Sequence, residues 1–75
     1  MYRGIIRIRQ SDITIKTPRR ETAKEVSKDL RIATLNLKSD RDNIATIVML
    51  KNDHLVYTAD VEVGELKRMA LRHAK

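Results

Sequence analysis

Histidine is the side chain best suited to proton transfer near neutral pH, and this chain has two, His54 and His73. A nucleophile activated by either would have to be a serine, yet no serine lies in the pattern of a nucleophile elbow. His54 instead fits a turn, and His73 fits a helix end, where the helix dipole favours a cation. We therefore expect no enzyme activity and no catalytic residue. A ribonuclease-type toxin stays open as an alternative, with His54 as its candidate base.

Metal and nucleotide sites also lack their usual ligands. Without cysteine, the two histidines cannot complete a four-ligand zinc site. Acidic pairs occur, Asp40 with Asp42 and Asp53 with Asp60, but acidic residues in turns are usually solvated capping groups. The two glycines lie far apart and form no phosphate-binding loop. We expect no metal, no cofactor and no small-molecule substrate.

Positive charge is the strongest chemical signal in the chain. Among 75 residues, sixteen are Lys or Arg and ten are Asp or Glu, which gives a formal net charge of +6 and a pI near 10.1. This balance favours nucleic acid or an acidic protein surface as the partner, and the alternative is that it only keeps the protein soluble. Tyr2 and Tyr57 are the only aromatic residues, too few to form a stacking platform for unpaired bases.

The N-terminal residues alternate with period two, which predicts a strand. Ile6 and Ile8 fall on one side of this strand, and the opposite side carries Ile5 together with three cations, which are Arg3, Arg7 and Arg9. A short turn follows, and the alternation then resumes up to Lys16. The pattern predicts a β-hairpin with a basic outer face.

Thr17 followed by Pro18 is typical of a helix start, because threonine caps free N–H groups and proline loses no hydrogen bond at the first helical position. We therefore expect a helix from this point, with Arg19 and Arg20 directly after the proline. An apolar stripe supports the helix, and its members are Ala23, Val26, Leu30 and Ala33. Residues 34–38 fit either more of this helix or an edge strand, and their alternation favours the strand.

The second half of the chain predicts a second hairpin and a second helix. Residues 44–50 are apolar on both alternating faces, which indicates a central strand buried on two sides. After a turn at 51–54 comes a strand whose inner face we expect to be Leu55, Tyr57, Ala59 and Val61. A helix is expected from about residue 63. Its inner stripe consists of Leu66, Met69, Ala70 and His73. Its other positions carry cations, among them Lys67, Arg68 and Arg72.

These elements predict one α+β domain over residues 1–75, in the order ββα-β-ββα. Its small antiparallel sheet would have four to five strands, with two helices packed on one face. The uncovered face would mix cations with aliphatic groups, a surface also suited to a homodimer. No apolar run is long enough to cross a bilayer, and no apolar leader follows Met1, so we expect a cytoplasmic protein without membrane contact.

The segment DVEVGELKRMALRHAK, residues 60–75, resembles the closing strand and helix of the HicA-type mRNA interferases, small basic toxins of double-stranded-RNA-binding-domain shape. The resemblance covers this segment alone, where Gly64, Glu65, Leu66 and Lys67 stand at that family's Gly-Thr-Leu-Arg-like helix start. The family's Gly-Ser-His catalytic segment is absent from the sequence. The resemblance therefore extends to a shared helix start, and neither the family's activity nor any of its catalytic residues carries over to this chain.

Two binding functions fit the sequence. The first is binding of the phosphate backbone of DNA or RNA, which the arginine-rich hairpin and the basic last helix favour. The second is a protein-binding inhibitor or adaptor, similar in size to small proteins of phages and mobile elements such as CRISPR inhibitors, that blocks an acidic or nucleic-acid-binding surface of a larger machine. The predicted binding residues for either partner are Arg3, Arg7, Arg9, Lys16, Arg19, Arg20, Lys67, Arg68 and Arg72.

Overall fold

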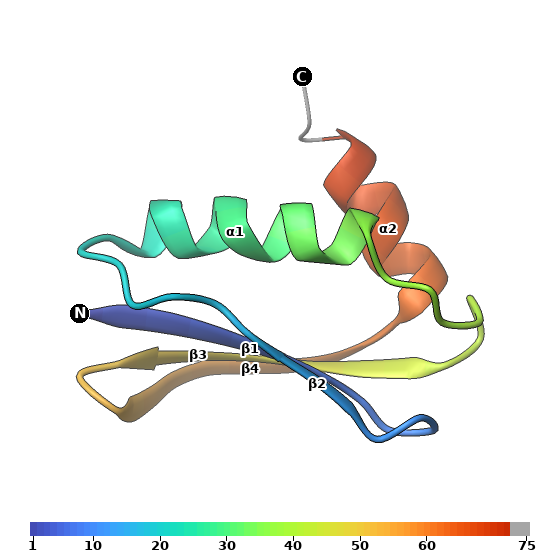
Figure 1. The fold of residues 1–75 in the computed structure, drawn as a ribbon, viewed down its shortest axis with the longest axis horizontal. Helices are drawn as coiled ribbons and strands as arrows, with labels where there is room; N and C mark the ends of the chain where they lie inside the picture. The colour runs from blue at the N-terminus through green and yellow to red at the C-terminus, as the bar shows by residue number, and fades with distance from the viewer. Residues whose placement is uncertain (73–75) are drawn as a thin grey trace.

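A computed structural model describes residues 1–72 as one antiparallel sheet with both helices on the same face (Figure 1). The elements in chain order are β1 (Tyr2–Ile8), β2 (Ile13–Lys16), α1 (Ala23–Leu35), β3 (Ile44–Lys51), β4 (His54–Glu62) and α2 (Val63–Arg72). The strand order is β2-β1-β3-β4, so β2 and β4 are the edges. The predicted α+β class, with two helices on one antiparallel sheet, is confirmed. His73, expected in the apolar stripe of the last helix, lies outside the described residues.

The core lies between the sheet and the helices. Ile6 and Ile8 of β1 and Ala45 of β3 have no exposed surface, and they pack with Val26 and Leu30 of α1. Successive side chains of a strand point to opposite faces. The even-numbered residues of β1 therefore face the helices, and its odd-numbered residues face away from them.

Gly4 allows α1 to lie close to β1. A Cβ atom at this position would come within 2.8 Å of three side-chain carbons of Leu30, so a residue with a side chain would force the helix or Leu30 to move. The Gly4 N–H donates to Thr17 Oγ1 over 2.9 Å, and the Thr17 N–H donates to the Gly4 carbonyl over 2.9 Å. Gly4 thus allows α1 to pack closely on the helix side of β1, and its backbone groups bind Thr17, the residue after β2.

The prediction that the first helix starts at Thr17 and Pro18 is wrong. The Thr17 hydroxyl is buried and engaged with Gly4, so it is not available to cap a helix. The backbone after it continues alongside β1 without forming a helix, because Tyr2 and Arg20 exchange backbone hydrogen bonds of 2.6 and 2.8 Å. Contact with the sheet therefore overrides the local helix-start signal.

The first helix begins instead at Ala23, with Thr22 as its N-cap. The backbone of Thr22 is extended, and its Oγ1 accepts from the Glu25 N–H over 3.2 Å. The Thr22 hydroxyl donates in turn to Glu25 Oε1 over 3.0 Å. Threonine with glutamate three residues later is the sequence pattern of a capping box, so this start was recognisable in the sequence.

The preference for a strand at residues 34–38 is also wrong, because α1 continues to Leu35. The Thr34 side chain is buried, and its hydroxyl donates to the Leu30 carbonyl over 2.7 Å within the helix. Asn36 caps the helix, and Leu37 folds inward to become part of the core. Within residues 1–72 the sheet therefore has four strands and no fifth.

Two assignments of faces in the second hairpin need correction. Met49 pairs with Tyr57 but Leu50 pairs with Leu55, so Val56 is an extra residue that shifts the register. Leu55 therefore lies on the same side as Leu50, away from the helices, and does not share the inner face of Tyr57. The prediction that β3 is buried on both sides is wrong as well, because only Ala45 in this strand is fully buried.

Candidate nucleic-acid interface

The open face of the sheet, the side turned away from the helices, carries cations on β1 and β2. The register pairs Ile5 with Lys16 and Arg7 with Thr14, and paired residues of antiparallel strands point to the same side. Arg3 stands two residues before Ile5 and Arg7 two residues after it, so each arginine is about 7 Å from Ile5 along the strand. Lys16 completes a group of three cations around Ile5. We call Arg3, Arg7 and Lys16 the cationic triad.

The charges of the cationic triad are not neutralised by neighbouring acids. Arg7 and Lys16 are exposed and Arg3 is half-buried. No acidic side chain of residues 1–72 forms an ion pair with any of the three. The Arg3 Nε is shielded from solvent and has no hydrogen-bond acceptor among the described residues. The triad can therefore offer its charges to an external phosphate or carboxylate.

Arg9, predicted to belong to the same basic face, is paired with an acid of the chain. Its guanidinium donates to Asp60 Oδ2 over 2.8 Å, and the Thr46 hydroxyl donates to Asp60 Oδ1 over 2.8 Å. Both partners are more than half exposed, so this ion pair contributes little stability. Glu62 follows Asp60 on the same side of β4. The open face is thus cationic over β1 and β2 and acidic over β4.

Arg19 and Arg20, which follow β2, also contact acids of the chain. An Arg19 nitrogen lies 3.4 Å from Asp53 Oδ1, and both side chains are exposed. Arg20 donates to the two carboxylate oxygens of Asp29 over 2.8 and 3.4 Å. The hydrogen bond to Asp29, followed by the charge attraction between the two groups, raises the pKa of Arg20 above its usual value. This ion pair ties the segment after β2 to α1, and we leave both arginines outside the triad.

The three predicted cations of the last helix lie in the helix layer, on the opposite side of the sheet from the triad (Figure 1). The Lys67 ammonium donates to the Leu37 carbonyl, and Arg68 pairs with Glu65 one turn earlier in α2. Arg72 is exposed and forms no ion pair with an acid of residues 1–72. The nine predicted residues therefore do not form one surface, and the triad is the part that the fold brings together.

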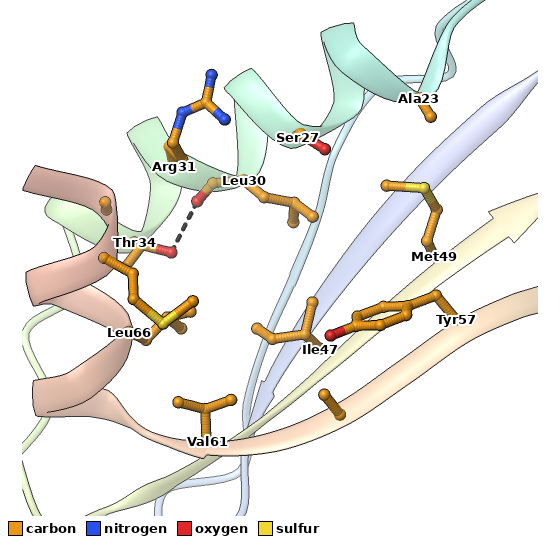
Figure 2. Close-up of a pocket in the computed structure, with 13 residues that line it drawn as sticks. Ala23, Ser27, Leu30, Arg31, Thr34, Ile47, Met49, Tyr57, Val61 and Leu66 are labelled. Carbon is orange, nitrogen blue, oxygen red and sulfur yellow. Dashed lines mark hydrogen bonds between the residues drawn. The ribbon is translucent and has the colours of Figure 1, made fainter. Parts of the chain in front are cut away.

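Sequence analysis missed an apolar groove of about 490 Å³ between the helices and the β4 side of the sheet (Figure 2). Leu30 projects into it from α1, and Ile47, Tyr57 and Val61 project from β3 and β4. Arg31 lines the rim, and its guanidinium points away from the sheet. Small residues on α1, β4 and α2 leave this space open, and they are Ala23, Ala59 and Ala70. Alanines at inward positions of three different elements were the available signal, although only the tertiary arrangement brings them together.

The described residues offer no assembled catalytic or metal site. His54 is exposed at the start of β4 opposite Lys51, and no hydrogen bond joins it to a serine of residues 1–72. No group of three metal-binding side chains gathers in this part of the chain. Neither of its helices is long and apolar enough to span a membrane. No protein-family model, curated protein or solved structure matches the chain in the comparisons.

Proposed function

We propose that the chain binds the phosphate backbone of nucleic acid through the cationic triad, as a binding protein and not as an enzyme. The observation that carries the proposal is that Arg3, Arg7 and Lys16 come from two adjacent strands, share one face and form no ion pair with an acid of residues 1–72. Cations that contact phosphates release counterions, and this gives affinity without base specificity. A protein with a formal net charge of +6 also attracts a polyanion over a longer range.

The chemistry of the open face favours backbone contact over the stacking of unpaired bases. Tyr2 packs against the core, and Tyr57 lines the groove on the helix side of the sheet. Neither aromatic ring therefore belongs to the open face, where the triad lies. Asp60 and Glu62 on β4 repel phosphates, so the nucleic acid would lie over β1 and β2.

A salt titration with matched variants tests this function. Binding to duplex DNA and duplex RNA is measured at several salt concentrations for the unmodified chain, Arg7→Gln and Arg72→Gln. The two variants lose the same charge from opposite layers of the fold. Each phosphate contact contributes about −0.9 to the slope of log K against log salt on B-DNA, so the triad predicts a slope of about −3. Arg7→Gln should weaken binding and make the slope shallower by about 1, and Arg72→Gln should change neither.

Two results would overturn the proposal. An equal loss of affinity in both variants would mean that binding follows net charge and not the triad. Absence of salt-dependent binding to either duplex would remove the function altogether.

A protein partner is the second candidate function, because the open face also presents aliphatic side chains. Leu55 is 60% exposed and lies beside Leu50, across β3 from the cationic strands. An inhibitor or adaptor would place this apolar strip against a partner and would place the triad against the partner's carboxylates. Such a complex should survive nuclease treatment and should weaken when Leu55 is replaced by Ser. Backbone binding to nucleic acid predicts that the complex is lost after nuclease treatment and that replacement of Leu55 by Ser leaves its affinity unchanged.

A further inference from the structure

The two edges of the sheet differ in how well they are protected from pairing with another strand. β2 has four residues, ends in Lys16 and is soon followed by Pro18. Short length, lysine and proline are among the features that block edge-to-edge association, as are other charged side chains and bulges. β4 has nine residues without lysine or proline. Its residues Leu55, Val56 and Tyr57 are exposed by 60%, 53% and 57%. Beyond the bulge at Val56, the β4 edge therefore has only the carboxylates of Asp60 and Glu62 as protection.

The backbone of β4 is oriented to accept a further strand. The Val63 N–H donates to the Asn43 carbonyl over 2.8 Å, which continues the ladder between β3 and β4. Hydrogen-bonded and non-hydrogen-bonded residues alternate along an antiparallel ladder. Odd-numbered residues after the bulge therefore direct their backbone groups to β3. Thr58, Asp60 and Glu62 direct theirs outward, where no strand of residues 1–72 pairs with them.

Apolar surface on the helix side continues to this same edge. Tyr57 and Val61 line the groove from β4 (Figure 2). Ala59 lines it from the same strand, and Met69 lines it from α2 while remaining 42% exposed. A strand added to β4 would extend the floor of the groove with its own side chains. It would therefore satisfy the outward backbone groups and cover exposed apolar area together.

We propose that the occupant is a second copy of this chain, whose β4 pairs antiparallel with β4 about a two-fold axis at Ala59. Tyr57 would then face the partner's Val61 on the helix side, an aromatic and β-branched pair of the kind that stabilises sheets. Thr58 would face the partner's Asp60 on the open face, where its hydroxyl can donate to that carboxylate. The product is a continuous eight-stranded sheet. This inference does not depend on nucleic-acid binding.

The pairing of side chains across the two β4 strands favours this register, and the cationic triads lie too far apart to oppose it. An axis at Asp60 would oppose two carboxylates, whereas the axis at Ala59 places Asp60 against the partner's Thr58 and Glu62 against the partner's Val56, at the bulge. With the axis at Ala59, the two cationic triads lie on the same side of the sheet with five strand spacings between the β1 strands. That separation is about 24 Å, well beyond the screening length of about 8 Å at physiological salt. The positive charge of each copy therefore does not oppose pairing at β4.

Sedimentation of the full chain at increasing concentration, after nuclease treatment, tests the pairing. We expect the 8.7 kDa chain to double its mass. Thr58→Pro removes an outward N–H of β4 and should leave a folded monomer. Thr14→Pro is the matched control, because Thr14 is an exposed threonine on the open face of the other edge strand, β2. Its own N–H points outward, since the hydrogen bonds from β2 to β1 come from the residues on either side of it. It should still form the dimer. A monomer at every concentration for the unmodified chain, or a dimer for Thr58→Pro, overturns the proposal.

A disulfide tests the register even if a proline variant fails to fold. The chain has no cysteine, so Ala59→Cys carries a single thiol. Residues opposite each other in a non-hydrogen-bonded antiparallel pair have Cα atoms about 4.5 Å apart, within the range that a disulfide spans. Mild oxidation with diamide should therefore link Ala59→Cys into a covalent dimer at low protein concentration. Thr58→Cys is offset from its symmetry mate and should stay monomeric. Equal cross-linking of the two variants, or cross-linking of Thr58→Cys alone, contradicts the axis at Ala59.

Discussion

At the scale of single residues, the contact between Gly4 and Leu30 determines how closely α1 lies against the sheet. Leu30 is largely buried, and its side chain occupies the space that a Cβ atom at Gly4 would need. Glycine in a strand interior normally weakens the strand, because it loses more backbone entropy on folding than other residues. Its presence in the central strand β1 is therefore explained by this close approach. Leu30 then remains available as one wall of the groove.

We predict that Gly4→Ala destabilises the fold by about 1 to 3 kcal/mol, the usual cost of overpacking a core. The sign of the change in the free energy of unfolding is informative, because a glycine-to-alanine change in a strand with free space would stabilise the fold. Urea unfolding monitored by circular dichroism measures the change. Leu30→Ala alone should cost about 2 to 5 kcal/mol. The double variant should lose less stability than the sum of the two single-variant losses, because removal of the Leu30 side chain frees the space for the new methyl group. Strict additivity would show that the two residues do not compete for the same volume.

At the scale of elements, each end of α1 is set by a different kind of interaction. Its start depends on a local hydrogen-bonded motif, in which the Thr22 hydroxyl accepts from the Glu25 N–H and donates to the Glu25 carboxylate. Its end has a local cap at Asn36 but also depends on tertiary packing, since Thr34 and Leu37 are both buried. A local motif is visible in the sequence, whereas burial at residues 34–37 requires the rest of the fold.

We predict that Thr22→Ala lowers the free energy of unfolding by about 1 kcal/mol, the usual value of an N-cap hydroxyl. The reason is that the Glu25 N–H loses its acceptor. Thr14→Ala is a suitable control, because Thr14 is an exposed threonine of β2 and caps no helix. Chemical denaturation of the two variants gives the comparison. An equal effect of both substitutions would contradict the capping role.

At the scale of the whole molecule, the distribution of charge matters more than its total. The open face has free cations over β1 and β2, a neutralised Arg9 in the ion pair with Asp60, and carboxylates over β4. Other cations are engaged in contacts at the turns and in the helix layer. The formal net charge of +6 therefore overstates how much of the surface can bind a polyanion.

We predict that Asp60→Asn strengthens binding to duplex nucleic acid, because it removes a carboxylate from the open face and releases Arg9. The slope of log K against log salt should become steeper by about 1 if Arg9 then contacts a phosphate. Glu65→Gln provides the matched control, since it releases Arg68 in the helix layer by the same change of charge. Fluorescence anisotropy over a salt series distinguishes the two. Equal gains would indicate that total charge, and not its position, controls affinity.

Much of the architecture followed from periodicity. The alternation in the first hairpin correctly separated Arg3, Arg7 and Lys16 from Ile6, Ile8, Ile13 and Ile15, and that separation is the basis of the candidate site. The extra residue Val56 was beyond this reasoning, because a bulge leaves the alternating pattern almost unchanged while it turns Leu55 to the other face. Ion pairs such as Arg9 with Asp60 join residues far apart in the chain, so the sequence did not show which cations are neutralised.

The sequence by itself determined the class of the fold, the faces of the first hairpin and the excess of positive charge, because period-two and helical patterns and residue counts are local properties. Only the tertiary structure decided which cations stay unpaired, where α1 begins and ends, and which edge and groove remain uncovered. Each of these depends on the register between strands or on the packing of helices against the sheet. Strand register and helix packing both bring together residues that are far apart in the sequence, and nothing in the local pattern indicates that such residues will be in contact.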